Sequence, residues 1–271
     1  MNREELIMSK VTDHYNTAVS LGFEVVGVFL QGSQNYELDE YSDEYTSDVD
    51  TKCFILPTLD DIASGRAPYS STYIRENSEH IDIKDIRVFF NMLEKQNTAY
   101  IETLFTNFYI INPKYEDLVN ELLSRNEKIA RINENQALRC LAGMSMEKYK
   151  ALEHPYPTTL DKIEKYGYDP KQLHHILRIN DLMKKYIAGV SYKECLLPNH
   201  ASYLMQVKKG LHPLFEARRV AEETDLANKK LKEENSTPTD VVNAGTLCFL
   251  NELERKFIKR FLKEEVLKDE E

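Results

Sequence analysis

The stretch GSQNYELDEYSDEYTSDVD, residues 32–50, carries the features that decide the fold expected of this chain. Its Gly-Ser pair comes after an apolar run, FEVVGVFL, at residues 23–30. Its last residues include Asp48 and Asp50, which open a second apolar run that ends at Leu56. Side chains alternate between the two faces of a strand, so both carboxylates point to one face if this run is a strand. A small-residue turn beside paired carboxylates is the minimal equipment for nucleotidyl transfer.

The bulk composition is that of a chain able to bury a large core. Its 271 residues and 31.6 kDa suffice for one large or two small domains. No window approaches the roughly 18 apolar residues of a membrane span, and the segment MNREELIMSK lacks the apolar core of a signal peptide. The four cysteines lie far apart without a Cys-x-x-Cys pair, which is typical of reduced thiols. We therefore expect a cytoplasmic protein without a membrane partner.

The net charge of −10 is unevenly distributed along the chain. Residues 1–112 carry 8 Lys/Arg and 19 Asp/Glu, whereas residues 113–271 carry 27 and 26. The acidity therefore belongs to the half with the paired carboxylates, where divalent cations would offset part of it. The second half offers basic residues to an anionic substrate, although a helical surface of mixed charge explains them equally well.

The apolar periodicity divides the chain into a mixed first part and a helical second part. In the first part we expect a helix over 4–20, strands over 23–30, 47–57 and 80–86, a polar loop with room for one helical turn over 60–78, and helices over 87–96 and 98–105. In the second part we expect helices over 115–124, 129–152, 170–188, 213–234 and 239–266. This order predicts an α+β catalytic domain at 1–112, built on a short mixed sheet, and a helical domain at 113–271.

Three groups of residues resemble the DNA polymerase beta-like nucleotidyltransferase superfamily, in particular its bacterial and phage branch of small nucleotidyltransferases. They are Gly32-Ser33 after a strand, Asp48-Val49-Asp50 at the start of the next strand, and the acidic run IDIKD at 81–85. The segment 86–105 also looks like that branch, and weaker similarity occurs in SMEKYKAL and KQLHHILRI. The resemblance covers about two thirds of the chain, mainly its first 105 residues. It implies a polymerase-beta-like core followed by a helical domain.

The resemblance also implies a two-metal transfer of NMP from an NTP, ATP first among them, to a hydroxyl acceptor such as an RNA or tRNA 3′ end, with release of pyrophosphate. Magnesium is a hard ion that prefers carboxylate oxygens and water, so Asp48 and Asp50 suit it, as they would manganese. For the third catalytic carboxylate and metal ligand, the resemblance points to Asp82. Asp85 is the alternative, although it also fits the N-cap of the helix that follows.

The Gly-Ser turn is the expected contact with the phosphates. Gly32 lets the backbone approach the β- and γ-phosphates, and Ser33 offers a hydrogen bond there. Relatives commonly carry a Tyr-Gly pair a few residues after the Gly-Ser pair, where this chain has Tyr36-Glu37. We expect that departure, together with the long acidic stretch before Asp48, to change the shape of the phosphate-facing turn. Neither change removes an expected metal ligand.

A basic ridge is expected on the helix over 170–188. At about 100° per residue, one side gathers Lys171, His174, His175 and Arg178, and the other side carries an apolar stripe. Lys171, His175 and Arg178, with Lys148 of the EKYK run, are candidate nucleotide-binding residues that would face a triphosphate or an RNA backbone. A solvated helix face is the alternative interpretation, and it agrees with the sequence at least as well.

Two functional hypotheses follow. The first is a magnesium-dependent nucleotidyltransferase that acts through Asp48, Asp50 and Asp82. The second is a catalytically silent nucleotide-binding or regulatory protein of the same fold. A still simpler interpretation makes the first two aspartates a solvated strand end after an acidic loop. Three mutually repelling carboxylates favour the enzyme, because a retired site has no chemical need to hold them together.

Overall fold

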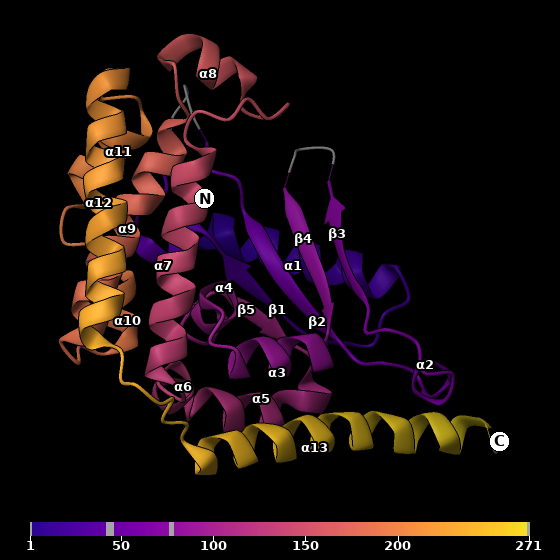
Figure 1. Cartoon of the computed structure of the whole chain (residues 1–271). Coiled ribbons are helices and arrows are strands. Elements are labelled where there is room, and N and C mark those ends of the chain that lie inside the picture. The colour runs from indigo at the N-terminus through magenta and orange to yellow at the C-terminus, as the bar shows by residue number, and fades with distance from the viewer. Residues whose placement is uncertain (1, 42–45, 76–78, 270–271) are drawn as a thin grey trace. The chain divides into compact units, whose positions relative to one another are not determined.

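The computed structural model describes residues 2–41, 46–75 and 79–269, which form a mixed α/β chain with two compact units (Figure 1). The sheet unit comprises Met1–Asn35, Asp39–Ile132 and Val242–Glu271, and the helical unit comprises Tyr36–Leu38 and Asn133–Val241. The division expected from the sequence lay at 112/113. In the structure, residues 113–132 and the last helix belong instead to the sheet unit. Residues 42–45 of the acidic stretch and 76–78 of the expected loop lie outside the described residues.

Within the described residues, the sheet has five strands in the order β3-β4-β2-β1-β5. The strands are β1 (Val25–Gln31), β2 (Asp50–Ile55), β3 (Ser70–Ile74), β4 (His80–Asp85) and β5 (Tyr109–Ile111). Only β2 and β4 pair in parallel, so the sheet is mixed, as expected for the first part of the chain. The three strands predicted from the sequence are present. The other two, β3 and β5, were not predicted.

Helix α1 (Arg3–Ser20) covers one face of the sheet. Its start is fixed by a capping box, in which Asn2 and Glu5 each bind the other's backbone amide. Its buried side chains pack on the aliphatic residues that β1, β2 and β4 direct to the same side. This core contains Ile7, Val11, Ala18, Val25, Val28, Leu30, Val49, Cys53, Ile55, Ile81 and Ile83.

The other face of the sheet is divided along the strands into an aromatic and a polar part. The ring of Phe54 stacks on Phe89 of α3 (Ile86–Glu94) at 3.8 Å, and Phe29 lies 5.6 Å from Phe54. Towards the start of β2 the same face carries polar side chains. We call this set the polar face; it consists of Gln31, Asp50, Lys52, Thr72, His80, Asp82 and Lys84.

The remaining elements of the sheet unit are short apart from its last helix. They are α2 (Leu59–Ala63), α4 (Thr98–Ile101), α5 (Glu116–Leu123), α6 (Asn126–Ala130), α13 (Ala244–Asp269) and the 3₁₀ turns Ser33–Tyr36, Glu102–Leu104 and Pro113–Tyr115. Helix α13 runs along α3 and α5 (Figure 1). Its Phe257 is fully buried between Phe90 and Tyr115, with ring centroids 6.1 Å from each.

The helical unit is built around one helix. Its elements are α7 (Glu134–Ala151), α8 (Leu160–Tyr166), α9 (Pro170–Ile187), α10 (Tyr192–Leu196), α11 (Ala201–Lys208) and α12 (Leu214–Asn235). Helix α9 packs against α7, α10, α11 and α12, so its side chains are buried on more than one side. The long helices were predicted, whereas α8, α10 and α11 were not. Among the described residues, no helix has both the length and the apolar composition needed to cross a bilayer.

Candidate functional site

The Gly-Ser turn after β1 requires its glycine. Gly32 has a φ of +109°, in the region that side chains other than hydrogen strongly disfavour. Ser33 then begins a 3₁₀ turn. The side-chain amide of Asn35 donates to the carbonyl of Leu30 at 3.0 Å, and Thr106 donates to the Asn35 side chain at 2.7 Å. The turn is therefore held from both sides in one conformation.

Gln34 joins this turn to the carboxylate pair. Its side chain is buried at 2% exposure, and its amide donates to the backbone carbonyl of Asp48 at 2.7 Å. Arg3 of α1 donates to the Gln34 carbonyl at 3.0 Å and binds both oxygens of Asp39 at 2.7 Å. The sequence alone does not predict these roles of Gln34 and Arg3, because they depend on contacts that no local pattern encodes.

Asp50 is the first residue of β2, and Asp48 lies two residues before it. Val49 between them is buried in the core, and Asp48 is exposed. Asp50 is half-buried, and its Oδ1 accepts a hydrogen bond from the His80 backbone amide at 2.9 Å. Among the described residues, none makes a hydrogen bond or ion pair with the Asp48 carboxylate.

Asp82 faces the same side of the sheet as Asp50, but its carboxylate is already bound. Strand β4 pairs with β2 so that Asp82 lies beside Lys52, whose Nζ is 2.6 Å from Asp82 Oδ2. Lys84 Nζ lies 2.7 Å from Oδ1, and the Thr72 hydroxyl donates to Oδ1 at 3.0 Å. Burial alone would raise the pKa of Asp82, but Lys52 and Lys84 outweigh it and hold that pKa below its usual range.

A buried network lies under the start of β2, on the α1 side. The imidazole of His14 is fully buried, with Nδ1 2.9 Å from the Thr51 hydroxyl and Nε2 3.3 Å from Glu79. Lys10 lies 3.2 Å from the same carboxylate. Burial lowers the pKa of His14, although Glu79 opposes this shift. Through Thr51, the network holds the backbone next to Asp50 on the α1 side of the sheet.

Asp85, the alternative third carboxylate, has a different role. It is the N-cap of α3, where its side chain accepts from the Arg87 backbone amide at 2.8 Å. Its Oδ2 also lies 2.6 Å from the Arg87 guanidinium. Asp85 belongs to the strand alternation of Ile81 and Ile83, so it does not share the polar face with Asp50. Across the described residues, no group of three or more His, Cys, Asp or Glu side chains is arranged to hold a metal ion.

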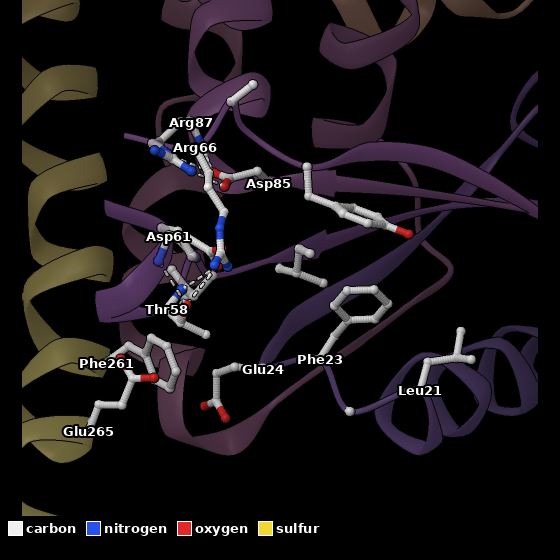
Figure 2. Close-up of a pocket in the computed structure, with 16 residues that line it drawn as sticks. Leu21, Phe23, Glu24, Thr58, Asp61, Arg66, Asp85, Arg87, Phe261 and Glu265 are labelled. Carbon is white, nitrogen blue, oxygen red and sulfur yellow. Dashed lines mark hydrogen bonds and ion pairs between the residues drawn. The ribbon is translucent and has the colours of Figure 1, made fainter. Parts of the chain in front are cut away.

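A pocket of about 590 Å³ lies at the other end of the strands (Figure 2). It is lined by the end of β2, by the Asp85–Arg87 pair and by residues of α13. Figure 2 shows Arg66 beside Asp61, and Glu265 on the neighbouring α13. From Asp50 to the end of β2 the strand spans roughly 17 Å, so this pocket is separate from the polar face.

The basic ridge on α9 is not a solvated helix face. Lys171 is exposed and His175 is half-buried, but His174 and Arg178 are 3% and 5% exposed. The Arg178 guanidinium lies 3.9 Å over the ring of Tyr36. This outcome follows from the central place of α9 in its unit, because helices pack on several of its sides.

The predicted nucleotide-binding residues of the helical unit therefore have different environments. Lys148 on α7 forms an ion pair with Glu147 at 3.0 Å, whereas Lys171 on α9 is exposed. Burial, with positive charges nearby, lowers the pKa of His175 far below its usual value. A nucleotide-binding role for Lys148, Lys171, His175 and Arg178 stays a prediction.

The buried imidazole of His174 predicts a loss of stability in acid. Burial, with Arg178, Lys208 and Lys171 nearby, lowers its pKa to about 3, and neither ring nitrogen has a hydrogen-bond partner. The unfolded chain therefore takes up a proton first as the pH falls below 6.5. Stability present above pH 6.5 is lost on the way to pH 3, by about 2 kcal/mol between pH 7 and pH 5.

Urea unfolding of His174→Leu at both pH values tests this expectation. The variant should lose about 2 kcal/mol less than the unmodified chain between pH 7 and pH 5. His200→Leu, which removes an exposed imidazole, should retain the original pH dependence. If stability depends on pH equally in the His174 variant and the unmodified chain, the His174 imidazole does not cause the loss of stability in acid.

The departure at Glu37 has a backbone consequence. Glu37 has a φ of +57°, in the left-handed region, and its side chain is exposed. The backbone at Glu37 therefore has a conformation that favours glycine, although the residue is a glutamate. The left-handed conformation of an L-residue costs roughly 1–2 kcal/mol.

We expect Glu37→Gly to raise the free energy of unfolding by about 1 kcal/mol, since the strain is removed while glycine loses more chain entropy. Gln96→Gly is the matched control, because Gln96 has a similar φ of +53°. Its buried amide, however, donates to the carbonyls of Leu93 and Ile129, both at 2.8 Å. Urea unfolding should show a gain for the first variant and a loss for the second. A lower free energy of unfolding in both variants would exclude backbone strain at Glu37.

Comparisons with known proteins find similarity among solved structures alone. No family and no curated protein matches the sequence. Among solved structures, the chain is similar to a nucleotidyltransferase-like protein from Exiguobacterium sibiricum, with 11% identity and a TM-score of 0.29. The alignment covers 84% of this chain and 75% of that protein. A TM-score of this size does not establish a common fold, so the functional argument depends on the residues of the site.

Proposed function

We propose that this chain is a divalent-metal-dependent nucleotidyltransferase with a polymerase-beta-like core, which moves NMP from an NTP, ATP first among the candidates, to a hydroxyl acceptor with release of pyrophosphate. The supporting observation is the hydrogen bond from Gln34 to the Asp48 carbonyl. It fixes the Gly32 turn to the segment that leads into β2 and carries Asp48 and Asp50. The turn proposed to contact the phosphates and the carboxylates proposed to bind metal thus belong to the same compact unit.

The carboxylate oxygens at the start of β2 suit a hard cation. Asp48 and Asp50 would hold magnesium, or manganese in its place, because both ions prefer carboxylate oxygens. Bound there, the cation would offset the charge of a triphosphate and of its leaving group. Gly32 and Ser33 would contact the phosphates through the backbone and the hydroxyl. An RNA or tRNA 3′ end is the first acceptor to test.

A catalytically silent nucleotide-binding protein is the second candidate, and the Asp82 ion pairs favour it. Lys52 and Lys84 remove the repulsion that three free carboxylates would exert. Metal ions are therefore less necessary to offset the repulsion between the carboxylates than the sequence alone predicts.

One experiment separates the two candidates. The chain is incubated with each α-labelled NTP, magnesium and total cellular RNA or protein, and the products are separated on a gel. A labelled macromolecule together with pyrophosphate supports the transferase. Triphosphate binding in a calorimeter, with no pyrophosphate from any acceptor, supports the silent protein instead.

A further inference from the structure

Lys52 lies next to the metal-binding pair along β2. It is two residues after Asp50, so both side chains point to the polar face. The Lys52 side chain is 4% exposed, and Nζ lies 2.6 Å from Asp82 and 4.4 Å from the centroid of the Tyr100 ring. An ammonium group in this position is held by a carboxylate on one side and an aromatic face on the other. It is a fixed positive charge of the site.

Asp82 has little capacity left for a metal ion. One of its oxygens binds Lys52, and the other binds Lys84 and the Thr72 hydroxyl. A metal ion could bind Asp82 only if it displaced ammonium groups from the carboxylate. Displacement of Lys52 would leave a buried ammonium group without its carboxylate, which is strongly unfavourable. Lys84 is also largely buried, with a side chain 12% exposed.

We infer that Lys52 takes the place of a second divalent cation, so that the site binds a single divalent ion through Asp48 and Asp50. Asp82 is then a positioning residue that holds Lys52 on the polar face. This inference rests on the proposed function, because it assumes that Asp48 and Asp50 bind a metal. It differs from the two-metal arrangement that the resemblance implies, and it agrees with the lack of a three-ligand metal group among the described residues.

The test is a count of manganese ions. The full chain is titrated with Mn²⁺ in the presence of a non-hydrolysable ATP analogue, and free and bound Mn²⁺ are followed by electron paramagnetic resonance. We expect a single ion per chain, without the spin coupling of two ions about 3.5–4 Å apart. Asp82→Asn should retain that ion with its affinity nearly unchanged. Asp48→Asn should weaken binding about tenfold or more, because the ion loses one of its two charged ligands.

Lys52→Met tests the role of the ammonium group directly. Removal of the lysine frees an oxygen of Asp82, so the folded variant should bind a second, weaker Mn²⁺ ion. A merely structural role for Lys52 predicts no additional ion. If Lys52→Met does not fold, the ion count of the unmodified chain and the affinity of Asp82→Asn still decide the question.

Several results would overturn the inference. These are two coupled ions in the unmodified chain, loss of an ion in Asp82→Asn, or a single ion in folded Lys52→Met. In each of these cases the proposed function stands, because Asp48 and Asp50 still bind metal. Mn²⁺ binding that is unchanged in Asp48→Asn would instead overturn the proposed function, and the inference with it.

Discussion

Replacing Asp48 and Asp50 together by asparagine is expected to abolish transfer of labelled nucleotide. The substitution keeps the shape of both side chains and removes the two negative charges that would hold the metal ion. Loss of a metal that offsets charge in the transition state removes several kcal/mol of stabilisation, and about 4 kcal/mol corresponds to roughly a 10³-fold lower rate. The measurement is pyrophosphate release with the NTP and acceptor that give a labelled product.

The controls for this double variant address its fold and its specificity. Circular dichroism and urea unfolding should be close to those of the unmodified chain, since Asp48 is exposed and Asp50 is only half-buried. Asp13→Asn, which removes an exposed carboxylate from α1, should retain the original rate. Undiminished transfer by the Asp48 and Asp50 variant would exclude the proposed chemistry.

The sequence predicts the parts of the fold that depend on one continuous apolar pattern. Helix α1 and strand β4 bury one face in a clear period, and strands β1 and β2 contain continuous apolar runs buried on both faces. Strand β3 has five exposed residues and owes its conformation to backbone pairing with β4, which leaves no apolar pattern to detect. Strand β5 has three residues, too few for any period to be read.

In the candidate site, too, the sequence predicts only those features that depend on one continuous segment. Strand alternation predicts a common face for Asp48 and Asp50, because it depends on one strand alone, whereas Asp82 was expected only from the resemblance. The contact between Lys52 and Asp82 depends on the register of two strands whose paired residues are 30 positions apart. That register is set by the packing of the whole sheet, so the lysine remained unnoticed. The same holds for Gln34, whose partner is reached only after the chain turns back.

The burial of His174 and Arg178 on α9 could not be predicted for a related reason. A single apolar stripe is typical of a helix that packs on one side. Helix α9 is enclosed by four other helices, so its second side buries Ile179, Leu182 and Tyr186 as well as Arg178. The basic residues were visible in the sequence, but the number of neighbouring helices was not.

Phe257→Ala in α13 is expected to lower stability more than any other substitution described above. It also tests to which of the two units α13 belongs. Phe257 is fully buried in the sheet unit between Phe90 and Tyr115. Removal of its ring should lower the free energy of unfolding of the sheet unit by about 3–5 kcal/mol, because apolar contacts are lost and a cavity remains.

Native-state hydrogen exchange can assign this loss to one unit, because amides report the free energy of local opening. Amides of β1 and β2 should lose protection in Phe257→Ala, whereas amides of α9 should change little. Phe215→Ala on α12 is the matched control, since its ring is 74% exposed and its removal should alter stability by less than about 0.5 kcal/mol. Loss of protection confined to α9 would instead assign α13 to the helical unit, as the boundary at 112/113 expected from the sequence requires. A loss confined to the sheet strands would mean that the polar face depends for its stability on a helix nearly 200 residues further along the chain.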